Sequence, residues 1–413
     1  MNIRYKPVLL ILILCIRVCH GNSQSPATVL RIDPSLAIGG KLSEIFDSIS
    51  YTPLETIPES VFGKIDQLEI TDDYYVILDY DTNSILFFFK NGRFHCKIKG
   101  NAIARTSRPF GIAQFSVNRQ RKELFFKLDS VTMGVYDFNG EKLREQKSLP
   151  SYYHAVASDD VQIYSAQEFP KDTVAESTTY ELKWVRNDRV IRTDLPYPVK
   201  PSTFIPGDMI RSMDSHFYHS GSDTTFYYTK PYDYTVYQVG PASCTPVYSF
   251  IIPAGISLPA DFSSSLTYKG HRVEYIMRGR KGVVFVISHV YQVGHLLFFE
   301  LETLGDNRNS SLIYNLNSGL LIGINHIEPD TSNHLLPVFH NQGSVTFAFS
   351  SRNFLTADSS CIYTSASAID MLSVPNIRAD QGLKNNPPLY NYFRHVVRTD
   401  NPVIIRLRPK QGM

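Results

Sequence analysis

The sequence contains little tryptophan and little cysteine, and its net charge is close to zero. Its 413 residues include one Trp and five Cys, against 25 Tyr and 25 Phe, and the formal net charge is +2. Five scattered cysteines are too few for a disulfide scaffold, so stability has to come from a hydrophobic core. A charge this close to zero argues against nucleic acid and anionic membranes as partners.

Long hydrophobic runs are also missing. The apolar stretch Val8–Ile16 is too short to cross a bilayer, which takes about 20 residues. Arg4 and Lys6 precede this stretch and the small residues Gly21 and Ser23 follow it, which is the order of an export signal. We therefore predict that the chain has no transmembrane helix and is exported to the periplasm or the cell surface.

This signal sets the first domain boundary. We predict a signal peptide over residues 1–23 and a single domain over residues 24–413. The signal carries three basic residues and no acidic one, so its removal changes the net charge from +2 to −1. The mature chain is therefore close to neutral.

A lipid anchor on Cys15 or Cys19 is the alternative to simple cleavage. Lipoprotein signals need a small residue directly before the modified cysteine, whereas these two cysteines follow Leu14 and Val18. Simple cleavage near residues 21–24 is therefore favoured over lipid anchoring.

Three cysteines, Cys96, Cys244 and Cys361, remain after the signal. They are scattered, without a C-x-x-C pair. An exported chain has room for one disulfide among them, and the sequence leaves open whether any two pair. The favoured interpretation is three small buried apolar residues.

What the sequence does have is a repeated pattern. YVILDYDTNSILFFFKNGRF (75–94) and LFFKLDSVTMGVYDFNGEKL (124–143) each contain two apolar runs, a polar break and an Asn-Gly pair. The two pairs lie 48 residues apart, and each predicts a two-residue hairpin turn because Asn and Gly tolerate a positive φ. The predicted strands cover residues 75–79, 84–90 and 93–98 in the first copy and residues 124–128 and 131–138 in the second.

This repeat predicts the architecture. A period of roughly 40 to 50 residues with about four short strands per unit is typical of a β-propeller blade. Four weaker units cover residues 180–195, 224–240, 282–302 and 344–358. We therefore predict an all-β fold, a six-bladed β-propeller of four-stranded antiparallel blades. A pair of β-sandwiches is the rival architecture, but it predicts no fixed period.

The two ends of the chain carry strands without a neighbouring partner in the sequence. One is TVLRID (28–33), and the other is VIIRLR (403–408). We predict that terminal strands close the ring by completing a shared blade. Before the second strand, residues 367–377 predict one or two helical turns, and residues 383–393 predict a loop that packs aromatic side chains.

Three short motifs frame the repeats. Residues 51–56 match Y-x-P-L-E-T, residues 63–70 match G-x-I-D-x-L-x-I, and Asp400-Asn401-Pro402-Val403 precedes the last strand. Together with the Asn-Gly hairpin, these motifs resemble those of the six-bladed β-propeller proteins exported by Bacteroidetes. The resemblance implies a cell-envelope or secreted location, often as a lipoprotein, and a relation to NHL-type propellers that suggests binding. It implies no settled activity.

The sequence departs from that family at one loop. The family usually has a G-x-G-P-G-E-(Y/F) loop after its first blade. The equivalent stretch here, residues 100–115, retains Gly100, Pro109 and Phe110 but lacks the acid. The role of that loop is therefore not carried over to this chain.

Catalytic signatures are absent from the sequence. It has no G-x-S-x-G, no H-E-x-x-H, no P-loop and no Gly-rich dinucleotide turn. His326, His334 and His340 lie close together, with His289 and His295 before them, but their spacing fits no short metal motif. We therefore assign no catalytic, cofactor-binding or metal-binding residue and expect no cofactor.

Acidic pairs and two mixed loops are the remaining candidates. Asp72-Asp73 and Asp159-Asp160 suit a calcium site or an acid–base pair, but turn formation explains them better. Residues 151–155 and 214–223 mix Tyr, His and Asp, which suits sugar or peptide recognition. Ordinary connections between strands explain these two loops at least as well.

The sequence favours binding over catalysis. A propeller enzyme would need His, Asp or Glu at matching positions of several blades. Asp79 and Asp129 match, but a turn explains both, and no His recurs with the period. We predict an exported non-catalytic propeller that acts as a binding or interaction module in the cell envelope, with an unknown envelope protein, peptide or glycan as its partner. The alternative is a propeller enzyme of the lactonase or lyase type with a metal at the central channel.

Overall fold

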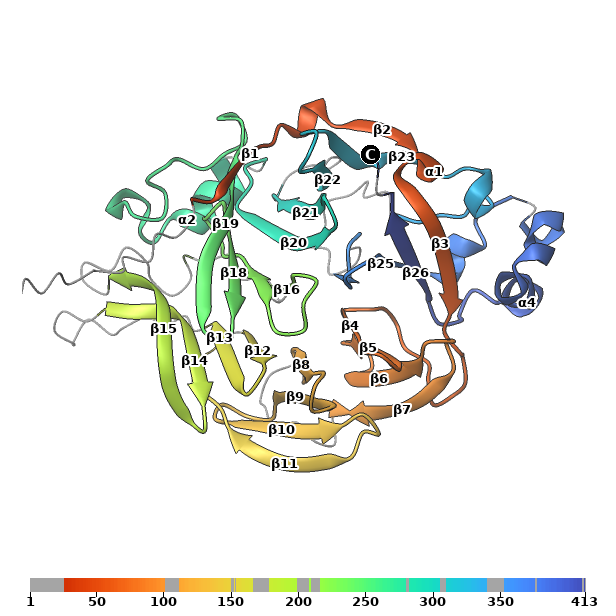
Figure 1. Cartoon of the computed structure of the whole chain (residues 1–413), viewed down its shortest axis with the longest axis horizontal. Coiled ribbons are helices and arrows are strands. Elements are labelled where there is room, and N and C mark those ends of the chain that lie inside the picture. The colour runs from red at the N-terminus through yellow and green to blue at the C-terminus, as the bar shows by residue number, and fades with distance from the viewer. Residues whose placement is uncertain are drawn as a thin grey trace, which may run out of the picture.

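The strands form six sheets around a central axis (Figure 1). The computed structural model describes residues 26–100, 111–149, 152, 154–165, 178–198, 208, 216–279, 282–304, 310–339, 353–375, 377–410 and 412. Each sheet contains four antiparallel strands, and two sheets gain a fifth strand from the N-terminal region. The predicted all-β fold, a six-bladed propeller, is therefore confirmed.

Blades 1 to 3 are built from consecutive strands. Blade 1 consists of β4 (Gln67–Ile70), β5 (Tyr74–Asp79), β6 (Ser84–Phe89) and β7 (Phe94–Lys99). Blade 2 consists of β8 (Phe115–Asn118), β9 (Glu123–Lys127), β10 (Thr132–Asp137) and β11 (Lys142–Lys147). Blade 3 consists of β12 (His154–Ser158), β13 (Val161–Ser165), β14 (Thr178–Arg186) and β15 (Arg189–Pro198). The strands predicted for the two repeats match β5, β6, β7, β9 and β10 to within two residues at each end.

Blades 4 to 6 involve the N-terminal region as well. Blade 4 contains β16 (Phe217–His219), β17 (Phe226–Tyr228), β18 (Thr235–Gly240) and β19 (Ser243–Ile251). Blade 5 contains β20 (Val286–Val293), β21 (Leu296–Glu302), β22 (Ser311–Asn315) and β23 (Leu321–Glu328). Blade 6 contains β24 (Thr356–Ala357), β25 (Ile362–Ala366), β26 (Val403–Pro409) and β3 (Phe46–Pro53). Of the predicted unit 344–358, residues 344–352 lie outside the described residues.

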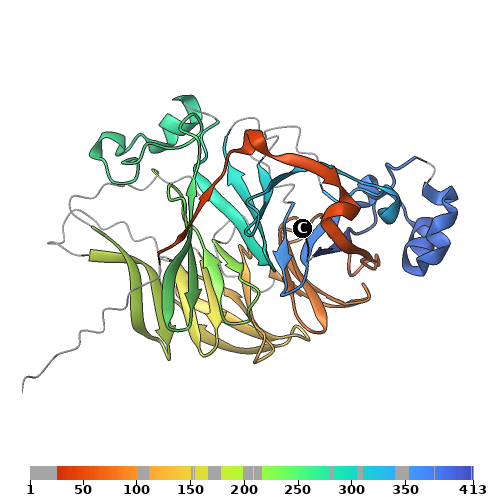
Figure 2. The same ribbon diagram turned by 45° about the horizontal axis from the view of Figure 1, so that its top comes forward.

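Residues 28–53, which we call the N-terminal strap, run along the outer edges of three blades (Figure 2). β1 (Thr28–Arg31) adds to blade 4 parallel to β19, and β2 (Ile38–Lys41) adds to blade 5 parallel to β23. A short helix, α1 (Leu42–Ile45), leads into β3, which pairs antiparallel with β26 in blade 6. The strand at 28–33 therefore exists as β1, but β3 is the one that pairs with the C-terminal strand.

The two Asn-Gly turns share one geometry. Only the glycines have a positive φ, +85° at Gly92 and +80° at Gly140, and each adjoining ladder has a register shift three to four residues before the Asn. The turns are therefore bulged hairpins rather than the predicted two-residue turns with two positive φ values. A Cβ at Gly92 would lie 2.0 Å from the carbonyl oxygen of Pro53, so close packing against β3 also requires glycine there.

Two helices lie in the connection between β25 and β26. The predicted helical turns are present as α3 (Ala368–Met371). The predicted loop over residues 383–393 is wrong, because η7 (Gln381–Asn385) and α4 (Pro387–His395) cover all of it except Asn386. Asn386 caps this helix by accepting a hydrogen bond from the Leu389 N–H, and proline is favoured in the first turn, where its missing N–H costs nothing.

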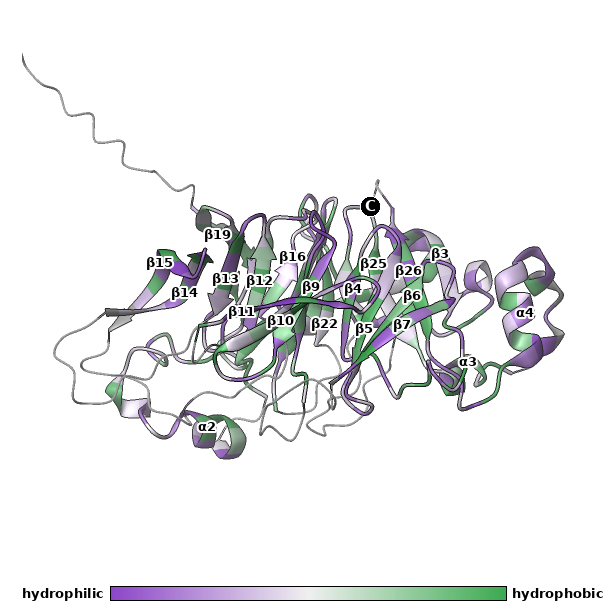
Figure 3. Ribbon diagram, turned by 90° about the horizontal axis from the view of Figure 1, so that it is seen from below, coloured by the Kyte–Doolittle hydropathy of each residue, from purple (hydrophilic) through white to green (hydrophobic). Residues whose placement is uncertain are grey.

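Two of the short helices lie on one face of the ring. Figure 3 shows α2 (Arg272–Glu274) and α3 on the same side of the strands. α2 lies in the connection that leads into β20, the innermost strand of blade 5. The innermost strands of the blades therefore begin on this side of the ring. We call this side the start face and the opposite side the end face. The remaining short helical segments are η1 (Pro34–Leu36), η3 (Leu266–Tyr268), η4 (Tyr275–Gly279), η5 (Thr331–Asn333), η6 (Ile377–Ala379) and η7 (Gln381–Asn385).

Asn401, from the D-N-P-V motif, ties the two ends of the chain together. It is 1% exposed, and its Nδ2 donates to the carbonyl oxygens of Glu55 at 2.8 Å and Ser60 at 3.0 Å. Its Oδ1 accepts from the Phe62 N–H at 3.2 Å. The side chain thus holds the segment that links β3 to β4 in place beside β26.

Replacing Asn401 by alanine should lower the free energy of unfolding by about 2–3 kcal/mol, because two buried backbone groups, the Ser60 carbonyl and the Phe62 N–H, lose their partner. Urea unfolding followed by circular dichroism measures this change. Asn317→Ala is the matched control: Asn317 lies exposed in the turn after β22, and a change within about 0.5 kcal/mol is expected there. Equal effects of the two substitutions would contradict the role of Asn401.

Candidate functional site

The innermost strands of the six blades line a cavity on the axis of the ring. It has a volume of about 50 Å³, and each blade contributes wall residues, among them Gln67, Ser116, Ala155, Tyr218, Tyr291 and Thr356. Pockets that enclose a drug-sized ligand are usually larger, roughly 300–1,000 Å³. The cavity therefore has room for the end group of a ligand rather than for a whole molecule.

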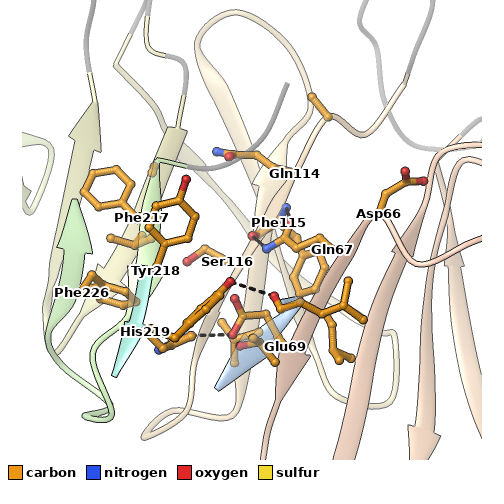
Figure 4. A pocket seen from close by; sticks show the side chains of 18 of the residues that line it. Asp66, Gln67, Glu69, Gln114, Phe115, Ser116, Phe217, Tyr218, His219 and Phe226 are labelled. Carbon is orange, nitrogen blue, oxygen red and sulfur yellow. Dashed lines mark hydrogen bonds and ion pairs between the residues drawn. The ribbon is translucent and has the colours of Figure 1, made fainter. Parts of the chain in front are cut away.

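Three charged or titratable side chains meet at the end-face side of this cavity. Glu69 comes from β4, Arg119 follows β8 directly, and His219 ends β16, so blades 1, 2 and 4 are joined across the channel. Arg119 Nη2 donates to Glu69 Oε2 at 2.9 Å. His219 Nε2 lies 2.7 Å from the same oxygen (Figure 4). We call these three residues the channel ion cluster.

Arg119 is held by more than Glu69. Its Nε donates to the carbonyl oxygen of Ile70 at 2.9 Å and lies 3.7 Å from Oδ1 of Asp223. The guanidinium therefore sits between the end of β4 and the turn after β16. This arrangement holds the three side chains together at the end-face side of the cavity.

The channel ion cluster is largely shielded from water. The side chains of Glu69, Arg119 and His219 are 15%, 17% and 10% exposed. Burial alone would raise the pKa of Glu69, but the nearby charges and hydrogen bonds of His219 and Arg119 outweigh it and lower this pKa to about 2. Glu69 is therefore an ionised carboxylate throughout the physiological pH range.

Neutral polar groups lie toward the start face. His154 Nδ1 contacts Oε1 of Gln114, and the rings of His154 and His216 meet edge to face with their centroids 5.2 Å apart. Burial lowers the pKa of His216 to about 4, so this imidazole is neutral near pH 7. The channel thus has Glu69, Arg119 and His219 at its end-face side, and His216 and Gln114 together with the carboxylate of Asp66 toward its start-face side.

Part of the channel ion cluster lies in a stretch that the sequence singles out. His219 and Asp223 belong to residues 214–223, and His154 belongs to residues 151–155. Glu69 and Arg119 were missed. The alternation Gln-Leu-Glu-Ile over residues 67–70 is the signal for Glu69, because it turns Gln67 and Glu69 to the same side of the strand, while Leu68 and Ile70 pack in the core.

The acidic candidates lie in turns. Asp73 faces Lys122 at 3.8 Å and Asp160 faces Arg186 at 2.8 Å, both at exposed positions. Asp79 Oδ2 accepts from the Thr82 N–H, and Asp129 Oδ1 accepts from the Val131 N–H, both at 2.9 Å. These bonds are those of turn-forming carboxylates.

The histidine candidates do not converge. His334 Nδ1 lies 2.9 Å from Asp380 Oδ2, and His326 Nδ1 lies 3.2 Å from the carbonyl oxygen of Ala37. His289 is buried in β20, next to the ring of Tyr218, and His340 lies outside the described residues. Within the described part of the chain, no three His, Cys, Asp or Glu side chains are grouped as metal ligands.

The cysteines after the signal are unpaired. Cys96, Cys244 and Cys361 are free thiols on three different blades. Cys244 and Cys361 are buried, and Cys96 is half-buried. Burial raises the pKa of Cys96 and of Cys244 to about 12.

Fold and channel define a six-bladed propeller with a small, charged axial cavity. The chain belongs to the DUF4934 family, a domain of unknown function, which matches residues 31–408. No curated protein matches its sequence. In the residues that the structure describes, no helix is both long and apolar enough to cross a membrane.

Several solved structures are similar in fold. One is a Bacteroides fragilis protein whose name describes it as a putative exported protein. It shares 13% sequence identity with this chain at a TM-score of 0.62, and the match covers 93% of this chain and 100% of that chain. A DUF4221 member from Bacteroides vulgatus has 10% identity and a TM-score of 0.42, over 88% and 97% of the two chains. BamB from Moraxella catarrhalis has 11% identity and a TM-score of 0.38, over 87% and 100%. The likeness to the B. fragilis protein supports the fold alone.

Glu69→Gln should lower the free energy of unfolding by roughly 3 kcal/mol at pH 7, because the folded state holds the carboxylate with a pKa of about 2 against an ordinary value of 4.5. Because folding lowers the pKa of Glu69, its ionised carboxylate makes its full contribution to the free energy of unfolding at pH values above the ordinary pKa. This stability is lost as the pH falls through the folded-state value. The difference between wild type and variant should therefore shrink between about pH 5 and pH 2.

Urea unfolding at several pH values measures this difference. Glu141→Gln is the control, since Glu141 is exposed in the turn after β10, and it should show almost no difference at any pH. A Glu69→Gln difference that stays constant down to pH 2 would show that the ionised carboxylate is not its source.

Proposed function

We propose that this chain is an exported binding protein of the cell envelope, and that its axial cavity receives the end group of a ligand. The observation that carries the proposal is the cavity itself, whose wall is shared by all six blades and whose floor holds an ionised carboxylate. An envelope protein, a peptide or a glycan would carry the end group. The finer assignment to NHL-type propellers stays a prediction.

The start face is the proposed side of access. The channel ion cluster spans the channel at the end face, between Glu69 of blade 1 and His219 of blade 4. On the other side the cavity is lined by Asp66, Ala113 and Gln114, which directly precede β4 and β8. A ligand larger than its end group would therefore lie over the start face.

The geometry supports binding better than catalysis. His219 is the titratable base at the cavity, and its Nε2 is engaged by the Glu69 carboxylate at 2.7 Å. Arg119 neutralises the same carboxylate. Such an arrangement fixes a charge in place, which suits recognition of a polar group.

Export supplies the proposed location. Its support is the basic and apolar pattern of residues 1–23, together with the name of the B. fragilis protein of similar fold. When the full chain is expressed in a Bacteroides host, we expect the mature protein in the envelope fraction, starting near residues 21–24. Mass spectrometry of the intact purified protein measures this start. A full-length chain in the cytoplasm would contradict export, and a lipid on Cys19 would replace simple cleavage with anchoring.

Filling the start-face side of the cavity should abolish ligand binding. Gln114 is half-buried and its side chain reaches across the upper part of the cavity in Figure 4, so Gln114→Trp would occupy that space. Leu143→Trp is the matched control, because Leu143 is 50% exposed on the outer strand β11. We expect a ligand found on peptide or glycan arrays to bind wild type and the control but not Gln114→Trp.

Two results would contradict this assignment of the cavity. One is a ligand that binds Gln114→Trp as well as it binds wild type. The other is the absence of any binding on both arrays. Melting temperatures of the two tryptophan variants, compared with wild type, show whether either variant has lost its fold.

A further inference from the structure

Glu69 offers the cavity one carboxylate oxygen that the channel ion cluster does not use. Both Arg119 and His219 contact Oε2. Oε1 has no hydrogen-bond partner among the described residues, and in Figure 4 one carboxylate oxygen of Glu69 points up into the cavity, away from His219. A shielded, ionised oxygen of this kind calls for a hydrogen-bond donor.

Carboxylates lie near the aromatic side chains beside this oxygen. Glu69 and Glu300 both lie close enough to Tyr291 to add to the rise in its pKa that burial causes. Glu302 adds in the same way to the rise that burial causes at Tyr218. Arg119, the cation that contacts Glu69, also reaches the Ile70 carbonyl and Asp223. A positively charged donor is therefore favoured over a neutral one.

The walls above Glu69 are aromatic. Phe115, Phe217, Tyr218, Phe226 and Tyr291 all line the cavity. Aromatic rings attract a cation to their faces and also pack against the methylene groups that carry it. The hydroxyl of Tyr291 donates to the carbonyl oxygen of Leu355 at 2.9 Å, so this ring is fixed in place.

We propose that the cavity binds a primary ammonium group, with Glu69 Oε1 as its acceptor. The inference rests on the proposed function, because it names the end group that the axial cavity receives. Size favours ammonium over guanidinium, since the cavity volume is about 50 Å³. A lysine side chain and an amino sugar are two sources of this group.

The test compares ligands that differ only in charge. Nα-acetyl-lysine N-methylamide, its Nε-acetylated form and the norleucine analogue are added in turn to the wild-type protein at millimolar concentration. Saturation-transfer difference NMR should show binding of the lysine compound alone, with the strongest transfer at the methylene next to the ammonium group. Glucosamine and N-acetylglucosamine, tested in the same way, distinguish a sugar source from a peptide source.

Variants then locate the acceptor. Glu69→Gln should weaken binding of the lysine compound by roughly 10- to 100-fold, the effect of one charge-assisted hydrogen bond. Glu141→Gln should leave binding unchanged, because Glu141 is an exposed turn residue on the outer part of blade 2. The comparison of charged and neutral ligands uses wild-type protein, so it holds even if Glu69→Gln folds poorly.

Three results would overturn the inference. They are binding of the neutral analogues as strongly as the amine, equal binding of the amine to wild type and Glu69→Gln, and no binding of either amine. None of these three results decides the proposed function, which the array ligands test separately. A neutral or anionic array ligand that Gln114→Trp no longer binds would keep the axial cavity as the binding site and reject only the ammonium group.

Discussion

The pairing of β26 with β3 is the contact on which the ring depends. Each blade is a small twisted sheet with two apolar faces, and a neighbour on both sides is needed to bury them. Val403, Ile404 and Ile405 of β26 are fully buried, each contributing about 1.5–3 kcal/mol relative to an exposed position. Because β26 lies between β25 and β3, these side chains are buried only when both ends of the chain meet in blade 6.

Local signals explain which parts of the fold the sequence reveals. β5, β6, β9 and β10 are predictable because each is a short run of β-branched and aromatic residues bounded by turn formers. α4 is the clearest miss. Asn386, Pro387 and Pro388 suggest a loop, yet Asn before a helix and Pro in its first turn are also the residues that start one. The short helix contains only one and a half further turns in which an apolar period can appear.

The candidate site has a weaker signal in the sequence. Glu69 and His219 are separated by 150 residues, and no local pattern reports that the ring brings them to 2.7 Å. The mixed composition of residues 214–223 marks His219, but it marks the exposed Asp223 equally. Sequence shows that a strand has polar residues on one side, whereas only the closed ring shows that this side faces an axis shared with five other strands.

The channel ion cluster has both a structural and a chemical effect. It connects blades 1, 2 and 4 across the axis, so it acts as a brace inside the ring. The same contacts hold the Glu69 carboxylate ionised beside an apolar wall. The contacts that brace the ring therefore also keep the charge of Glu69 in the cavity. Replacing Arg119 or His219 is expected to change both the bracing of the ring and this charge.

The N-terminal strap sets the order in which the protein is able to finish folding. β3 is made early, but its partner β26 begins only at residue 403, and β1 and β2 depend on blades 4 and 5. The first strands to emerge thus wait for partners that are made much later, and β3 waits longest, so the ring closes only when β26 is made. A chain built in this way stays open until its final residues are available, which suits transport across a membrane in the unfolded state.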